Sequence, residues 1–349
     1  MALRIAVCTS QVPFEIGGTE VLTDALVERL KAWGCEVEPV KLPLSWDPRE
    51  DLIKSYLAWR LINLRYSISD HLPIDRVIAL KFPAYVVDHP YKITWLIHQF
   101  RQVYDLYGTP YSNFDNSPPD AQLRETIRRI DITTLRESRH LFAISGNIAK
   151  RLSKFNGVNS EVLYPPPPLD GRFYNNGYGN YVLSVSRLNK LKRVDLLVRA
   201  IGKTKTPIRC LIAGRGPDLE SLHALAKELG VGKKIDFLGF VTNEKLVELY
   251  ASALACYYAP VDEDYGLATL EAMKSGKPVV TTNDSGGVIE FALDRETGMV
   301  TAPDDATALA SRLDELYEDR QLTERLGTNA AAMVAGITWE ATIHRLLEV

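Results

Sequence analysis

Two glutamates with seven residues between them, Glu263 and Glu271, flank a turn that Gly266 marks. Glu263 follows an apolar run over 253–259 that is typical of a buried strand, and Glu271 lies in a helix pattern. The first N–H groups of a helix have no intrahelical partner and carry partial positive charge, which suits a phosphate. A carboxylate on each side of that phosphate can bind hydroxyl groups. The pattern therefore indicates a site for a nucleotide sugar.

A cationic segment, Ser186 to Arg193, also lies between an expected strand and an expected helix. Cations at this place oppose the helix dipole, so a role in stabilising the helix is not favoured. An anion bound between them removes the conflict. We interpret the segment as part of the same phosphate site.

The segment from Glu263 to Glu271 resembles the Glu-x7-Glu motif of retaining glycosyltransferases of family 4, which have the two-domain GT-B fold. The resemblance implies that Glu263 contacts the hydroxyls of the donor sugar and that Glu271 contacts the nucleotide ribose. It also implies that the distal phosphate is bound by the backbone amides of Gly266, Leu267 and Ala268.

The cationic segment resembles the family's Gly-Arg-Leu…Lys-Gly pattern, whose arginine and lysine hold the diphosphate, and Arg187 and Lys192 match it. Ser186 and Arg193 stand in place of the two glycines. Neither change removes the positive charge, and Arg193 is an alternative to Lys192 as the phosphate ligand.

Glycine-rich turns follow other expected strands. Gly17 and Gly18 precede a helix, where a backbone can approach a ligand closely. The resemblance places this pair near the donor diphosphate and the acceptor. Gly214 and Gly216 begin like a dinucleotide fingerprint, but Leu219 occupies the position of the third glycine, so the pattern alone is weak. The resemblance places them at the nucleotide pocket.

Three further residues complete the predicted site by resemblance. His98 ends an apolar strand and matches a family histidine that faces the transferred sugar, although a structural role is the alternative. Val241 belongs to the segment that flanks the base. Glu290 matches the glutamate of the family's Gly-Gly-x-x-Glu segment, with helix packing as the alternative.

The composition agrees with a globular chain that has two domains. The length is 349 residues, with 46% hydrophobic and 24% charged residues, and the net charge of −3 gives no reason to expect nucleic acid as a partner. The four cysteines have no paired spacing and are expected to be reduced thiols of a cytoplasmic protein. No apolar run reaches the ~18 residues that span a membrane, and the N-terminus does not resemble a signal peptide.

Strand and helix patterns alternate, which predicts an α/β fold with parallel sheets covered by helices. The expected strands lie near 4–9, 35–40, 75–81, 92–98, 140–145, 160–164, 181–186, 208–213, 235–238, 253–259 and 278–282. A first helix is expected to bury Leu22, Ala25, Leu26, Leu30 and Trp33 on one face. Further helices are expected near 194–201, 219–229, 304–318, 320–335 and 338–348, and a long loop at 108–120.

The run Pro165 to Pro168 excludes helix and sheet interior, so we place an interdomain linker at 165–178. The predicted domains are 1–168, a Rossmann-like domain that binds the acceptor, and 178–335, a Rossmann-like domain that binds the donor. Helix 338–349 is expected to pack back on the first domain. In the GT-B fold two such domains face each other across a cleft.

The resemblance therefore implies a hexosyltransferase that is retaining, and the cations of the site favour one that is independent of metal. We expect it to move a hexose from a UDP- or GDP-sugar to a hydroxyl of a glycan, glycolipid or small molecule, as in polysaccharide biosynthesis. A sugar phosphorylase on the same fold and a non-catalytic nucleotide-sugar-binding protein stay open as alternatives. A nicotinamide-dependent oxidoreductase is disfavoured by the missing third glycine.

No metal and no cofactor are expected. Asp262-Glu263-Asp264 is a literal Asp-x-Asp that could hold a divalent cation, but Arg187, Lys192 and a helix N-terminus already supply positive charge. The expected partners are the nucleotide sugar and the acceptor. A basic helix face over 124–139 could contact anionic lipid at an inner membrane surface, although a solvated face is the plainer interpretation.

Overall fold

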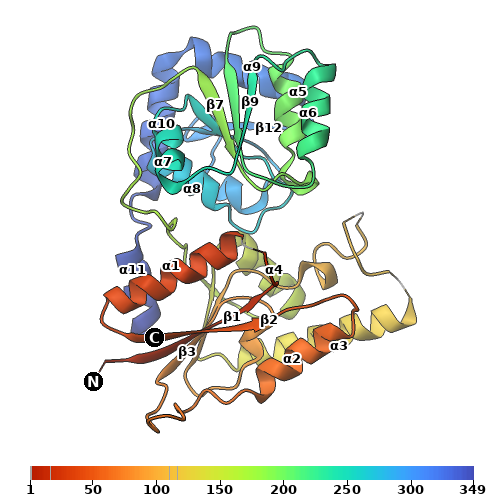
Figure 1. Cartoon of the computed structure of the whole chain (residues 1–349), viewed down its shortest axis with the longest axis vertical. Helices are drawn as coiled ribbons and strands as arrows, with labels where there is room; N and C mark the ends of the chain where they lie inside the picture. The colour runs from red at the N-terminus through yellow and green to blue at the C-terminus, as the bar shows by residue number, and fades with distance from the viewer. Residues whose placement is uncertain (1, 16, 110, 116) are drawn as a thin grey trace. The chain divides into compact units, whose positions relative to one another are not determined.

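In a computed structural model of the chain, residues 2–15, 17–109, 111–115 and 117–349 are described. The chain divides into two compact units (Figure 1). Unit 1 is Met1–Pro168 together with Trp339–Val349, and unit 2 is Leu169–Thr338.

Unit 1 is built on a parallel sheet. Its strands are β1 (Arg4–Gln11), β2 (Glu36–Pro43), β3 (Arg76–Ala79), β4 (Lys92–Leu96), β5 (His140–Ala143) and β6 (Glu161–Val162). They form one six-stranded sheet in the order β2-β1-β3-β4-β5-β6, and every paired neighbour is parallel. The central strands β1, β3 and β4 are mostly buried because helices cover both faces of such a sheet.

The helices of unit 1 are α1 (Gly18–Ala32), α2 (Asp51–Leu61), α3 (Pro118–Arg136), α4 (Gly146–Asn156) and α11 (Trp339–Glu348). Helices α1 and α11 lie together on one side of the sheet, and α2 and α3 lie on the other (Figure 1). Trp33 was expected on the buried face of α1, but the helix ends at Ala32 and Trp33 is 46% exposed. The expected loop 108–120 is shorter than predicted because α3 begins at Pro118, and Pro110 and Asn116 of that segment lie outside the described residues.

Unit 2 repeats the architecture with a second parallel sheet. Its strands are β7 (Tyr181–Val185), β8 (Arg209–Ala213), β9 (Ile235–Gly239), β10 (Ala255–Tyr257), β11 (Val279–Thr282) and β12 (Gly298–Thr301). The order is β12-β11-β10-β7-β8-β9, again with parallel neighbours.

The helices of unit 2 are α5 (Val194–Ile201), α6 (Leu219–Glu228), α7 (Asn243–Ala251), α8 (Leu267–Lys274), α9 (Ala306–Glu318) and α10 (Arg320–Val334). Helices α5, α6 and α9 cover one face, while α7, α8 and α10 lie on the other (Figure 1). Buried side chains of α5, α6 and α9 pack with the strands in one hydrophobic core. This packing holds the carboxyl ends of β7, β10 and β11 in fixed positions, and the predicted site residues follow those ends.

Candidate functional site

Several predicted site residues of unit 2 lie where its strand order reverses. From β7 the chain proceeds to β8 and β9 on one side, and then returns to β10 next to β7 before it continues to β11 and β12. Ligands of open parallel sheets bind at such a switch point, beyond the carboxyl ends of the strands. Arg187 and Lys192 follow β7, and Glu263 follows β10, so the sheet places these residues on both sides of that point.

Lys192 and Glu263 contact each other directly. The Lys192 ammonium forms an ion pair with the Glu263 carboxylate and donates a hydrogen bond of 2.9 Å to the hydroxyl of Tyr258. Burial acts to lower the pKa of Lys192, but Tyr258 and Glu263 outweigh it and raise that pKa above its usual value. The site therefore contains a firmly protonated ammonium, neutralised by the carboxylate that was predicted to bind sugar.

Helix α8 begins beside this ion pair. Gly266 has φ of +90°, and a Cβ at that position would lie 3.0 Å from both the Tyr258 ring and Val288, so the turn requires glycine. The first hydrogen bond of the turn runs from the Thr269 N–H to the Gly266 carbonyl, at 2.9 Å. The amides of Leu267 and Ala268 precede it, at the positive end of the helix dipole.

Glu271 lies on α8, one turn beyond these amides, and is partly buried. Its carboxylate accepts a hydrogen bond of 2.9 Å from the hydroxyl of Tyr250. Burial raises the pKa of Glu271 to about 7, and the bond from Tyr250 only partly offsets this effect. Near neutral pH this carboxyl group therefore exists in both protonation states.

The glycines near the site have a structural reason that the sequence did not reveal. A Cβ on Gly214 would overlap the Ser186 carbonyl, and a Cβ on Gly216 would overlap the Leu188 carbonyl. The Leu188 N–H donates to the Arg215 carbonyl at 2.9 Å, so the two loops pack backbone against backbone. Both glycines thus support the loop that carries Arg187, which is itself an exposed residue.

Gly287 supports the next loop in the same way. A Cβ there would lie 2.7 Å from the Asp264 carbonyl, and the Gly287 N–H donates to the Glu263 carbonyl at 2.8 Å. Glu290 ends the short 3-10 helix Gly286–Glu290 and is partly buried. Val241, also partly buried, lies two residues beyond the end of β9 and two residues before α7.

Arg193 has a different role from the one predicted. It was considered as an alternative to Lys192 at the phosphate, but its guanidinium is buried and makes five hydrogen bonds inside unit 2. Two of them reach Asp284, at 2.6 and 3.0 Å, and the others reach Thr282 and the carbonyls of Ala259 and Pro260. Its donors are therefore committed to linking the loops after β10 and β11.

The remaining predicted residues belong to unit 1. Gly17 directly precedes α1 and Gly18 begins it, and the Gly17 N–H donates to the Glu20 carboxylate at 2.9 Å. His98 lies two residues beyond β4, partly buried, with Nδ1 3.0 Å from the Gln99 carbonyl oxygen.

Sequence reasoning missed an ion pair next to the glycine pair. Lys81 follows β3 and contacts Glu20 at 2.7 Å, with both side chains largely buried. Because β1 and β3 are neighbours at the switch point of the unit 1 sheet, this pair occupies the position that Lys192 and Glu263 occupy in unit 2. A lysine directly after an apolar strand, at 81, was the available signal.

The predicted basic face over 124–139 is partly used inside unit 1. The Arg124 guanidinium lies 3.8 Å from the centre of the Tyr107 ring and donates to the Val103 carbonyl. Arg129, Arg136 and Arg139 are exposed. Within the described residues, no helix is both long enough and apolar enough to cross a bilayer. The same part of the chain contains no group of three or more His, Cys, Asp or Glu side chains with the arrangement of a metal site.

Two parallel six-stranded sheets flanked by helices define the class of GT-B proteins. Sucrose-phosphate synthase from Thermosynechococcus elongatus is similar with a TM-score of 0.76 and 20% identity, covering 99% of this chain and 98% of that one. Anabaena HepE in complex with UDP and glucose is similar with a TM-score of 0.72 and 17% identity, covering 99% and 98%.

The family is indicated by the second unit. Residues 173–333 match the model of the family "Glycosyl transferases group 1". The D-inositol 3-phosphate glycosyltransferase of Nocardia farcinica is 34% identical over 178 residues, covering 48% of this chain and 39% of that protein. The N-acetyl-alpha-D-glucosaminyl L-malate synthase of Bacillus anthracis is 24% identical over 91% of this chain and 89% of that protein.

The matched segments span about two fifths of the length of the first two curated relatives, 39% and 38%. The chain is therefore similar to the group 1 family of glycosyl transferases over residues 173–333, and it resembles glycosyltransferase family 4.

Proposed function

We propose that the protein is a retaining hexosyltransferase that needs no metal ion. It moves a hexose from a UDP- or GDP-sugar to a hydroxyl group of a glycan, glycolipid or small molecule. Unit 2 binds the donor, and unit 1 binds the acceptor with the help of Gly17, Gly18 and His98.

One observation carries the proposal. Lys192, Glu263 and the start of α8 meet at the switch point of a parallel sheet, inside the segment that matches the glycosyl transferase family. An ammonium and the amides of Leu267 and Ala268 suit a diphosphate, and carboxylates on both sides suit sugar hydroxyls. The similar Anabaena HepE has been solved in complex with UDP and glucose and with UDP-glucose, which supports a nucleotide sugar as the donor.

The charges suggest how the reaction is accelerated. The bond between the anomeric carbon and the diphosphate oxygen breaks, so negative charge grows on the diphosphate while the sugar becomes cationic. Arg187, Lys192 and the amides of α8 stabilise the leaving group where that charge develops. The acceptor oxygen bonds to the anomeric carbon on the same face, and its proton moves to the departing phosphate. Glu263 holds the sugar hydroxyls during this exchange.

A thermal-shift panel tests the donor. We expect UDP or GDP, and one matching nucleotide sugar, to raise Tm, because a ligand that binds only the folded state stabilises it. Lys192→Ala should remove most of the shift. Lys190→Ala is the matched control, since Lys190 is an exposed lysine in the same segment. If no nucleotide raises Tm but inorganic phosphate supports cleavage of a disaccharide, the phosphorylase replaces this proposal.

Transfer itself separates an enzyme from a binding protein. The donor that raises Tm is incubated with an acceptor panel, and the release of nucleoside diphosphate is compared with the glycosylated product. Equal amounts of released nucleoside diphosphate and glycosylated product support the proposed transferase activity. Binding of the donor with no product from any acceptor supports the non-catalytic alternative.

The proposed location is the cytoplasm, and its support is chemical. The four cysteines are free thiols, and three of them, Cys8, Cys210 and Cys256, are buried. Free thiols suit a reducing compartment. Contact with the inner membrane surface stays a proposal. Pelleting with vesicles that contain anionic lipid tests it, with neutral vesicles as the control.

A further inference from the structure

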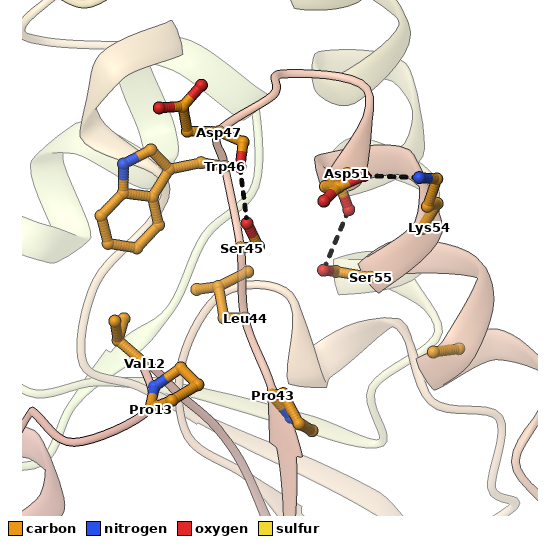
Figure 2. A pocket seen from close by; sticks show the side chains of 11 residues that line it. Val12, Pro13, Pro43, Leu44, Ser45, Trp46, Asp47, Asp51, Lys54 and Ser55 are labelled. Atoms are coloured by element: carbon orange, nitrogen blue, oxygen red, sulfur yellow. Dashed lines mark hydrogen bonds and ion pairs between the residues drawn. The ribbon is translucent and has the colours of Figure 1, made fainter.

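Unit 1 contains a cavity of about 460 Å³ at the carboxyl ends of its first two strands (Figure 2). Val12 and Pro13 follow β1, and Pro43 ends β2. The chain then continues through residues 44–47, and the first turns of α2 add further lining residues. The volume falls within the range of roughly 300–1,000 Å³ that is usual for small-molecule sites, and parallel sheets bind ligands at this edge.

One side of the cavity is apolar and contains an indole. Leu44, Val12 and the two prolines form its base, and Trp46 stands above them (Figure 2). The Trp46 ring centre lies 6.5 Å from that of Phe100, which is stacked on Phe82 at 4.8 Å. The contact with Phe100 restricts the indole, which reduces the conformational entropy lost on binding.

Polar residues of α2 line the other side, and the lining as a whole carries a net negative charge. Asp51 and Lys54 form an ion pair at 2.6 Å and neutralise each other. The remaining charged residue of the lining is Asp47, whose carboxylate lies on the same side of the loop as the Trp46 ring (Figure 2). Within the described residues, that carboxylate accepts no hydrogen bond and joins no ion pair. An ionised carboxylate can only accept hydrogen bonds, so the cavity offers acceptors to hydroxyl groups and repels anions.

We propose that this cavity binds the sugar acceptor and selects a neutral hexose over an anionic substrate. A pyranose ring has an apolar C–H face, which fits against Trp46, and hydroxyl groups at its rim, which donate to Asp47. The proposal rests on the proposed transferase function, and it names the class of acceptor and two residues that determine it. It also sets the chain apart from relatives whose names include inositol phosphate or malate, because both of these are anions.

Direct binding tests the cavity without any transfer reaction. Methyl glucoside, methyl galactoside and methyl mannoside are titrated into the full chain while tryptophan fluorescence is recorded. At least one of them should change the emission, and Trp46→Phe should abolish that change while it largely keeps the affinity measured by saturation-transfer NMR. Trp33→Ala is the matched control, since Trp33 is exposed at the end of α1 and outside the cavity. A response that survives in Trp46→Phe and is lost in Trp33→Ala overturns the proposal.

Steady-state transfer tests the role of the same residues in acceptor choice. Trp46→Ala should raise the acceptor KM about tenfold or more, as the loss of one aromatic contact predicts, and Trp46→Phe should restore most of the affinity. The KM for the donor should stay unchanged in both. An acceptor KM in Trp46→Ala equal to that of the wild type contradicts the proposal.

Charge selectivity gives an independent readout. The wild type should use the neutral hexoside and should reject malate and inositol phosphate. Asp47→Asn should weaken binding of the neutral hexoside, because a charged hydrogen-bond acceptor is lost. It should also reduce the preference for neutral over anionic acceptors, because the repulsion of anions is removed. Preferential use of an anionic acceptor by the wild type overturns the proposal.

The transferase function and the acceptor site can be contradicted separately. If no nucleotide raises Tm and no donor is consumed, the transferase function fails, while the fluorescence titration still reports on the cavity. If the donor is consumed and transferred but the Trp46 and Asp47 variants behave like the wild type, the acceptor site lies elsewhere and the transferase function stands.

Discussion

Arg193 and Asp284 form a paired ionic contact, with guanidinium-to-carboxylate distances of 2.6 and 3.0 Å. The same guanidinium donates to the carbonyls of Ala259 and Pro260, just ahead of Glu263. Arg193 adopts φ of +46°, a conformation that favours glycine, and the family pattern has glycine here. In this chain an arginine with a strained backbone thus stands where the pattern has glycine, and its side chain fixes the loop that carries Glu263.

The first prediction concerns this contact. Arg193→Gly relieves the backbone strain but removes the donor to two buried carbonyls and leaves Asp284 with only the hydrogen bond from the Thr282 hydroxyl, so it should lower the free energy of unfolding by about 2–3 kcal/mol. Asp284→Ala should lower the free energy of unfolding by less than Arg193→Gly does, because the Asp284 side chain is partly exposed. In urea unfolding, the double variant should lose less free energy of unfolding than the sum of the losses of the two single variants. Strictly additive losses would show that the pair does not act as a unit.

The fold was more predictable than the role of individual residues. Helix α2 was missed because Leu57 and Leu61 are apolar and exposed, which blurs the buried face of Leu52, Tyr56 and Trp59. Helix α7 was missed because its apolar residues run almost directly into those of β10. Strand β12 is short and polar at its end, so it gave no clear pattern.

Within the site, the residue types predicted a phosphate ligand. Which of the two cations, Lys192 or Arg193, can reach that ligand depends on contacts between residues far apart in the sequence. Nothing in the order Lys192-Arg193 indicates that the arginine is turned into the protein and the lysine toward Glu263. The prediction that Gly214 and Gly216 line the nucleotide pocket stays open, and the structure adds that their missing side chains allow one loop to pack on another. The cavity around Trp46 joins segments from β1, β2 and α2, and it could not be seen before these were placed together.

The second prediction uses the ion pair between Lys192 and Glu263. Glu263→Gln keeps the shape of the side chain but no longer neutralises the ammonium. Affinity for free UDP or GDP should therefore stay equal or increase, while transfer should fall about tenfold or more because the sugar is held less well. Calorimetry and an initial-rate assay on the same preparation measure the two effects. Parallel loss of nucleotide binding and transfer would mean that Glu263 supports the phosphate site rather than the sugar.

The third prediction concerns the pH dependence of nucleotide binding. Burial raises the pKa of Glu271 to about 7, and its ionised form is the better acceptor for ribose hydroxyls. Affinity should increase as the pH rises from 6 to 8, by about tenfold relative to Glu271→Gln. The comparison with the variant cancels the ionisation of the nucleotide itself. The same pH profile in both proteins would remove Glu271 from the ribose site.

The fourth prediction concerns stability in unit 1. Asp131 is fully buried and accepts hydrogen bonds from Tyr56 and Tyr104, at 2.7 and 2.6 Å. Burial raises its pKa to about 6, although the tyrosines lower it in part. The folded state thus binds a proton more tightly than the unfolded chain, so this group's stabilising contribution is complete below about pH 4 and is lost as the pH rises through 6.

The difference in Tm between the wild type and Asp131→Asn isolates this contribution, because the variant has no ionisable group there. The wild type should lose stability relative to the variant between pH 4.5 and pH 7.5, by on the order of 2–3 kcal/mol. A difference that is constant across this range, or that grows in favour of the wild type, contradicts the assignment.

The central claim is that Lys192 and Arg187 bind the diphosphate of the donor, and comparison of a nucleoside with its diphosphate tests it most directly. Affinities for uridine and UDP, or guanosine and GDP, are measured in the wild type, Lys192→Ala, Arg187→Ala and the control Lys190→Ala. The first two substitutions should weaken binding of the diphosphate but not of the nucleoside, by about 10- to 100-fold, and should lower the transfer rate by about two to three orders of magnitude. If folded Lys192→Ala and Arg187→Ala proteins bind the diphosphate as tightly as the Lys190→Ala control, the phosphate site is not where the account places it.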